Sequence, residues 1–168
     1  MYRYFLGLLA VSLLISCSNV ETHTLTLTDV ELVAEGPLFE GANMATADQD
    51  IDLTASIESL EGAYKSVKSA KLTSAVLHMI DTINFNFIDD ISLLLASDNA
   101  DMTQVALLSE VPPDATVVEL NVGNDQKGLN KILNDEKITF VADMNINQDT
   151  FIDLRIRGDF IFELEIVR

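Results

Sequence analysis

The sequence predicts an all-β, mainly antiparallel protein: a single-domain β-sandwich, immunoglobulin-like in general architecture, with one or two short helices. Segments of alternating polarity recur at intervals of about 8–12 residues, as in sandwich domains. Turn-forming Gly, Pro, Asn and Asp residues separate them. The chain of 168 residues has the length of one ordinary domain and can bury a core without a disulfide or a structural metal.

The first strand is predicted over residues 21–34, a Thr-rich segment of alternating polarity. Leu25 and Leu27 share one parity, whereas Val30 and Leu32 share the other. A strand keeps its apolar residues on one face only if such a change of parity is absorbed by an extra residue. We therefore expect a bulge or bend near Asp29.

The next four segments carry weaker patterns. Residues 35–50 contain two glycines and a proline and are predicted to form a loop with at most a short edge strand. Residues 51–57 fit another strand, and residues 57–66 have the apolar spacing of a short helix. Residues 67–80 fit either a strand buried on two faces or a continuation of that helix, and the pattern leaves both alternatives open.

Further along the chain, residues 84–99 are predicted to form strand, turn and strand, with the adjacent Asp89 and Asp90 in the turn. Residues 105–122 are predicted to form two short strands around a Pro-Pro break. Residues 126–136 place three apolar residues on one helical face and are predicted to form a short helix.

The last two strands have the clearest periodicity. Alternate residues are apolar from 138 to 146 and again, with Gly158 as the interruption, from 152 to 166. A strand of about 15 residues is near 50 Å long, so we expect a kink at Gly158. Residues 157–159 spell Arg-Gly-Asp, the tripeptide that integrins bind. A strand interior is a poor place to display it, so we expect no such binding.

The N-terminus has the pattern of a secretory leader: basic Arg3, an apolar run from 5 to 15, and small residues before Cys17. The apolar run is about half the length that a membrane-spanning helix needs. Residues 14–17, Leu-Ile-Ser-Cys, resemble the bacterial lipobox. The resemblance implies that a diacylglycerol is attached to the Cys17 thiol, that the chain is cut before this residue, and that the new N-terminus is acylated.

This resemblance implies three segments: a signal peptide at 1–16 that is removed, a lipidated tether at 17–22, and a β-sandwich domain at 23–168. Cys17 is the only cysteine, so no intramolecular disulfide is expected, and lipidation would consume a thiol that is otherwise reactive. In lipoproteins an Asp directly after the cysteine retains the protein at the inner membrane. Ser18 stands there, which implies outer-membrane sorting in a bacterial cell envelope, on a face that the sequence leaves open.

Charge limits the partners. The formal charge is −17, and removal of Arg3 with the leader leaves −18. Nucleic acid and anionic lipid headgroups both require clustered Lys and Arg, so we expect neither as a direct partner. The sequence predicts attachment to the membrane through Cys17 and an envelope or extracellular protein partner that it does not identify.

One segment has the spacing of a calcium loop: Asp143, Asn145, Asn147 and Asp149 alternate with other residues. The helix–loop–helix version requires Gly at its sixth position and Glu at its twelfth, where this chain has Gln148 and Leu154. The flanks are predicted strands. We therefore treat these four residues as weak candidates and expect no metal and no cofactor.

No catalytic residue is predicted. His23 and His78 lack a recognisable Ser or acid partner in sequence, and no GxSxG, HExxH or phosphate-binding Gly loop occurs. Sugar-binding modules usually stack sugar rings on Trp or Tyr. The mature chain has no Trp and only Tyr64, so the sequence disfavours an aromatic sugar-binding platform.

The general pattern resembles small β-sandwich lipoproteins of the Bacteroidetes type. We expect a non-enzymatic binding or assembly module held at the membrane. The alternatives are an accessory protein of glycan capture, a hydrolase with an unrecognised site, and a carrier of an apolar ligand.

Overall fold

A computed structural model describes residues 19–57, 60, 64–80 and 84–168. Nearly all of the regular structure in this part of the chain is antiparallel β, as the sequence predicts. The elements are β1 (Val20–Ala34), β2 (Gly41–Asp50), α1 (Leu53–Ser56), β3 (Ser66–Met79), β4 (Ile88–Ser97), β5 (Ala100–Leu108), β6 (Val117–Glu119), β7 (Asn121–Val122), α2 (Leu129–Ile132), β8 (Lys137–Ile146) and β9 (Leu154–Val167).

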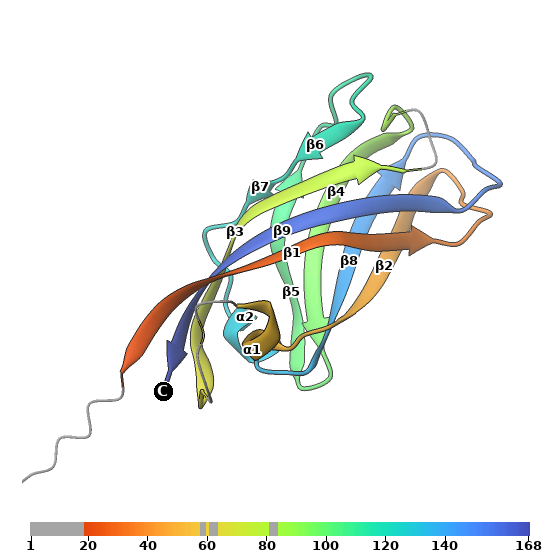
Figure 1. Ribbon diagram of the computed structural model, residues 1–168. Coiled ribbons are helices and arrows are strands. Elements are labelled where there is room, and N and C mark those ends of the chain that lie inside the picture. The colour runs from red at the N-terminus through yellow and green to blue at the C-terminus, as the bar shows by residue number, and fades with distance from the viewer. Residues whose placement is uncertain (1–18, 58–59, 61–63, 81–83) are drawn as a thin grey trace, which may run out of the picture.

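The strands form one sheet in the order β6-β3-β9-β1-β2-β8-β4-β5-β7, folded over itself into two layers. Strands β3, β9 and β1 make one layer, and β2, β8, β4 and β5 make the other (Figure 1). A single pair, Val33 opposite Thr46, joins β1 to β2 where the sheet passes from one layer to the other. The predicted β-sandwich class is therefore confirmed.

Alternation explains how the core is filled. The even-numbered residues of β9 from Leu154 to Ile166 are all buried, and so are those of β8 from Ile138 to Ile146. Phe140 of β8 stacks on Phe160 of β9 with ring centroids 4.6 Å apart, so the two layers meet through an aromatic pair. Burial of such side chains is the main favourable term in the folding of the domain.

The opposite side of the sandwich is closed by residues 117–134. β6 pairs with β3, and β7 pairs with β5, so one short stretch contacts both layers. Beyond β6, the edge of β3 is covered by side-chain amides. Gln126 bonds the N–H and C=O of Leu72 (2.6 and 3.0 Å), and Asn134 bonds those of Val67 (2.8 and 2.9 Å). These amides take the hydrogen bonds that a neighbouring strand would make, which protects an exposed edge from pairing with other chains.

The bulge expected in the first strand is present. The pairing of β1 with β9 shifts between Leu27 and Val30, so Thr28 and Asp29 together oppose Asp159. Asp29 has a positive φ of 59°, a conformation that Asp tolerates better than most residues. The bulge keeps Leu27 and Val30 on the buried face although their parities differ.

Several predictions from weak patterns are wrong. Residues 41–50 form a full strand, β2, that pairs with β8 along its whole length. Its small alanines and polar residues gave little local signal. Residues 53–56 form helix α1 and not a strand, because the Asp52 carboxylate caps the N–H groups of Thr54 and Ala55.

Of the two alternatives that the sequence left open for residues 67–80, the strand is the one observed, because β3 covers Ser66–Met79. Of the helix predicted over 57–66, residues 58–59 and 61–63 lie outside the described part of the chain. None of the described residues in this range is helical, and Ser66 already belongs to β3. The helix predicted over 126–136 is reduced to α2, and the turn predicted around Asp89 lies earlier, at 85–87.

The predicted boundary of the domain also moves. Val20, Glu21 and Thr22 belong to β1 and pair with the end of β9, whereas the sequence assigned residues 17–22 to a tether. The alternation that predicts a strand from residue 21 is thus the better guide, and β1 begins one residue earlier than this pattern indicated. The signal peptide at 1–16 and Cys17 lie outside the described residues.

Candidate functional site

Two loops lie side by side at one end of the sandwich. Residues 35–40 connect β1 to β2, and residues 147–153 connect β8 to β9; we call them the distal loop pair. They are at the end opposite α1 and α2 (Figure 1). Leu38 and Thr150 form an antiparallel bridge, with N–H···O distances of 2.8 Å and 2.9 Å in the two directions.

Two carboxylates hold the loops together further. Asp149 accepts a hydrogen bond from the N–H of Glu40, and Asp153 accepts one from the N–H of Gly36, each at 2.9 Å. Gly36 lies so close to the other loop that a Cβ would be 2.8 Å from the carbonyl carbon of Ile152. Only glycine fits this approach, so the two loops form one braced unit.

The braced unit presents large apolar side chains to solvent. Phe39 is 60% exposed, Phe151 81% and Ile152 57%. Leu38 turns inward and is buried. Side chains that flank an antiparallel bridge point to the face opposite the bridged pair, so Phe39 and Phe151, which flank the pair Leu38–Thr150, share the outward side. Ile152 follows Phe151 in the chain, so alternation does not place it on this side, but its side chain is exposed as well. We call Phe39, Phe151 and Ile152 the apolar tip.

Acidic residues accompany the apolar tip on the two loops. Glu35, Glu40, Asp149 and Asp153 are exposed on the same two loops. No Lys or Arg occurs from residue 19 to 64 or from 138 to 154. The distal loop pair therefore combines exposed apolar side chains with negative charge and carries no positive charge.

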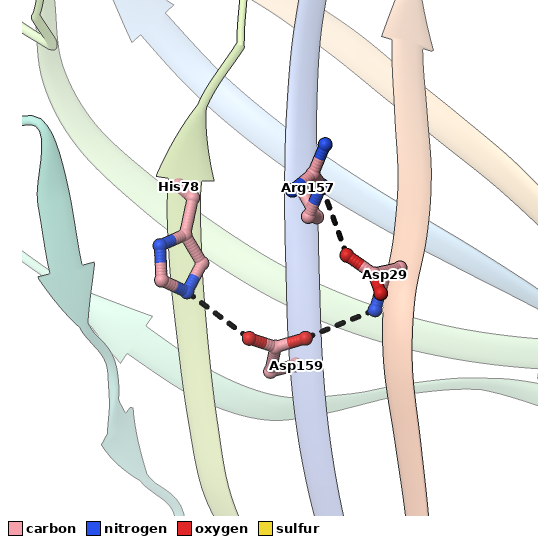
Figure 2. A network of polar contacts seen from close by, with 4 residues as sticks. All are labelled: Asp29, His78, Arg157 and Asp159. Atoms are coloured by element: carbon pink, nitrogen blue, oxygen red, sulfur yellow. Dashed lines mark hydrogen bonds and ion pairs between the residues drawn. The ribbon is translucent and has the colours of Figure 1, made fainter.

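A second polar feature lies on the outer face of β3, β9 and β1 (Figure 2). Asp159 contacts the imidazole Nε2 of His78 at 3.1 Å through one oxygen and accepts the N–H of Asp29 at 2.9 Å through the other. The Asp29 carboxylate pairs with Nε of Arg157 at 3.2 Å. A His–Asp pair can take part in acid–base catalysis, but here the second carboxylate oxygen of Asp159 accepts the backbone N–H of Asp29 in the β1 bulge. The arrangement braces the bulge.

The Arg-Gly-Asp tripeptide is part of this feature. Residues 157–159 lie within the continuous strand β9, as expected, with Gly158 buried between the exposed Arg157 and the half-buried Asp159. Both charged side chains have partners within the sheet. His23, the other histidine, is buried in β1 with its Nε2 3.4 Å from Glu21.

The weak calcium candidates are divided between β8 and the distal loop pair. Asn145 donates to Asp90 and Asn147 donates to Asp89, both at 2.8 Å, while Asp149 holds Glu40 as described. Asp143 is exposed on β8. Among the residues that the structure describes, no group of three or more His, Cys, Asp or Glu side chains is placed to hold a metal ion.

Asp89 and Asp90 are adjacent in β4, where the pairing with β8 shifts between Ile88 and Asp90. This irregularity lets both carboxylates reach asparagines of one neighbouring segment. Their role in the structure is to join β4 to the end of β8.

Two open hollows lie near the helices. One, of about 620 Å³, is lined by Asp50, Asp52, Glu136 and Tyr64 among others. Burial, and to a lesser degree the charge of Asp52, raises the pKa of Tyr64. Asp52 is already committed to capping α1, and hydrogen bonds from Thr54 and Ala55 lower its pKa. The other hollow, of about 520 Å³, combines two acids, Asp98 and Asp101, with Lys127 and Lys131.

Comparisons with known proteins are limited to remote structural likeness. No protein-family model matches the chain, and no curated protein matches it. A structure of Mud crab tombus-like virus is 6% identical with a TM-score of 0.33, over 90% of each chain. One of Desmodium yellow mottle tymovirus is 9% identical with a TM-score of 0.29, over 100% of this chain and 94% of the other. TM-scores this low support no conclusion about function.

Sequence reasoning missed the apolar tip. Phe39 lies in a Gly- and Pro-containing loop, and Phe151 directly follows the turn sequence Asn-Gln-Asp-Thr. Large apolar residues inside two turn sequences were the available signal. In addition, no helix in the described ranges has the length and apolar character needed to cross a bilayer.

Proposed function

We propose that this chain is a lipid-anchored lipoprotein of a bacterial envelope, sorted to the outer membrane, and that it acts as a non-enzymatic binding or assembly module. The resemblance of residues 14–17 to the lipobox supports the anchor at Cys17. Two or more acyl chains anchor a protein stably, whereas one binds only marginally.

The observation that carries the proposal is the direction of β1. Its first residue, Val20, is three positions after Cys17, and Ala34, its last, leads directly into the distal loop pair. At about 3.3 Å per residue the strand is close to 50 Å long. Arg168 donates its N–H to the carbonyl of Asn19 at 3.1 Å, so both ends of the domain lie at the anchor side.

A module built in this way holds its distal loops away from the membrane that anchors it. The braced, exposed loops suit contact with another molecule, and the short connection to Cys17 keeps that contact at the envelope. The proposed activity therefore depends on attachment and on surface shape.

The test compares the natural chain with Cys17→Ser and Ser18→Asp, with Ser18→Ala as the matched control. Mass spectrometry of the natural protein and of Ser18→Ala should give an acylated Cys17 at the N-terminus, and both should fractionate with the outer membrane. Cys17→Ser should leave unlipidated material, and Ser18→Asp should retain lipidated protein at the inner membrane. A mature, unmodified chain cut elsewhere would contradict the anchor.

The non-enzymatic part is tested separately on purified protein. We expect no turnover on panels of glycan, ester and peptide substrates. Robust turnover that is lost on changing one acidic or histidine residue, with stability unchanged, would assign the protein to the enzymes.

A further inference from the structure

The apolar tip is costly to expose. Single apolar side chains at a surface are ordinary, but clustered ones in a monomer mark a contact site. Phe39, Phe151 and Ile152 come from two segments more than 100 residues apart and are brought to one end of the molecule. Aromatic side chains, Phe among them, are enriched at the cores of protein interfaces, where a few residues carry most of the binding energy.

The tip is held in one arrangement before any partner binds. The bridge between Leu38 and Thr150 and the two carboxylate contacts to the N–H groups of Glu40 and Gly36 all connect the two loops. A surface that is ordered in advance loses less conformational entropy on binding. This favours a specific contact over adaptable adhesion.

The charge around the tip selects among partners. The same two loops expose Glu35, Glu40, Asp149 and Asp153 and carry no Lys or Arg. Acidic residues disfavour insertion into a bilayer that carries anionic headgroups. They also disfavour a second copy of the same tip, since like charges placed face to face are destabilising.

We propose that the apolar tip is the docking surface for a protein whose apolar pocket has a rim of Lys and Arg side chains. This inference rests on the proposed function, because it names the surface with which the anchored module works. The aromatic side chains fill the pocket and supply the affinity. The four acidic residues of the loops meet the basic side chains of the partner and supply the orientation and the rate of association.

The first experiment uses the full lipidated chain in intact cells. Photoreactive benzoylphenylalanine replaces Phe39 or Phe151, and in the control it replaces Met102, which is also exposed but lies on β5 near the opposite end. We expect both tip positions to crosslink to the same site of one protein, with Lys or Arg beside the crosslinked peptide, and position 102 to miss it. Crosslinks to lipid, to a second copy, to unrelated proteins or to nothing would overturn the proposal.

The second experiment measures affinity for that crosslinked protein after purification. Phe39→Ala and Phe151→Ala should each weaken binding about 30-fold, the usual loss at an interface hot spot, and Met102→Ala should leave it unchanged. Glu35→Gln combined with Glu40→Gln should slow association and reduce its dependence on salt. Equal affinities for the tip and control variants, with circular dichroism unchanged, would overturn the docking surface.

The two proposals fail in distinguishable ways. Cys17→Ser should move the protein off the membrane and leave the affinity of the tip for the purified partner unchanged. Phe151→Ala should leave acylation and membrane fractionation unchanged. Loss of crosslinking with an intact anchor therefore refutes the tip alone, and absence of acylation refutes the anchor alone. Vesicles of phosphatidylethanolamine and phosphatidylglycerol test the lipid alternative on the unlipidated Cys17→Ser chain, so that the anchor does not contribute. Equal sedimentation of Cys17→Ser with and without Phe151→Ala supports the protein partner, and a tip-dependent difference overturns it.

Discussion

Replacing Gly158 by Ala tests the packing at the centre of the sandwich. A Cβ at this position would lie 2.5 Å from Cε2 of the Phe160 ring, well inside van der Waals contact. Phe160 is completely buried, and its ring stacks on Phe140 of the other layer. The ring cannot swing out into solvent, so the protein can accommodate the new methyl group only by displacing the ring from this stack.

The expected cost follows from three terms. Overpacking a well-filled core costs about 1–3 kcal/mol, and a disturbed aromatic pair loses about 0.5–1.5 kcal/mol. The lower entropy of Ala in the unfolded chain returns about 0.4–1 kcal/mol. We expect a net loss of about 2 kcal/mol in the free energy of unfolding, out of about 5–15 kcal/mol for a typical domain. For a domain of this size the loss lowers the melting temperature by about 4–8 °C.

Urea unfolding followed by circular dichroism measures this loss. Gly123→Ala is the matched control, because a Cβ there lies 3.4 Å from the carbonyl oxygen of Val105, an ordinary contact. A double-mutant cycle adds Phe160→Leu, which removes the ring that the methyl group meets. The reasoning is refuted if Gly158→Ala and Gly123→Ala are equally stable, or if the cost of Gly158→Ala is the same with Leu at position 160.

Three further predictions concern register, pH and the sheet edge. Phe162→Asp should cost more than about 3–5 kcal/mol, since a buried charge adds to the loss of the ring, whereas Glu163→Gln should be nearly silent; equal urea midpoints would show that the register of β9 is wrong. Hydrogen bonds from the side chains of Lys137 and Thr139, of which the one from Lys137 has the larger effect, lower the pKa of Asp48 below its ordinary value of 3.8, which the unfolded chain is expected to show. Stability from this carboxylate is therefore present above pH 3.8 and lost as pH falls through the lower folded pKa. Urea midpoints measured across acid pH should show a shallower decline in Asp48→Asn, and identical slopes would contradict the assignment. Asn134→Leu should cost about 1–3 kcal/mol by leaving the Val67 N–H without its acceptor, and light scattering should detect association through the uncovered edge of β3. Asn124→Leu, in an exposed loop, is the control, and equal scattering from both would exclude edge protection.

The fold class could be predicted because alternation is a local property. Residues 138–146 form β8 with the register that the pattern indicated, and β9 follows the apolar parity of its segment from Leu154 onward. Strand β2 could not be predicted in this way, because only Ala45 of its residues is fully buried and its ladder with β8 depends on residues about 100 positions away. Local alternation therefore predicts strands that bury large side chains, and it misses strands that form mainly through backbone pairing with a distant strand.

The candidate site depends almost wholly on distant pairing. The partner of His78 is Asp159, which is 81 residues further along the chain. The apolar tip likewise exists only because Leu38 pairs with Thr150. Neither pairing leaves a trace in local sequence, so the sequence alone identified neither the partner of His78 nor the surface with which the expected binding module would work.

The bulge in β1 connects these observations. Without the extra residue, a strand whose apolar parity changes at Asp29 would turn either Leu25 and Leu27 or Val30 and Leu32 to solvent. The bulge buries all four, and Asp159 holds it by accepting the Asp29 N–H. The ladder with β9 can therefore run from Val20, next to the proposed anchor, to Ala34, next to the apolar tip. The polar network in Figure 2 thus helps to set how the distal loops are oriented relative to the end that carries the proposed anchor. Its contribution to function is to keep one strand continuous between the two.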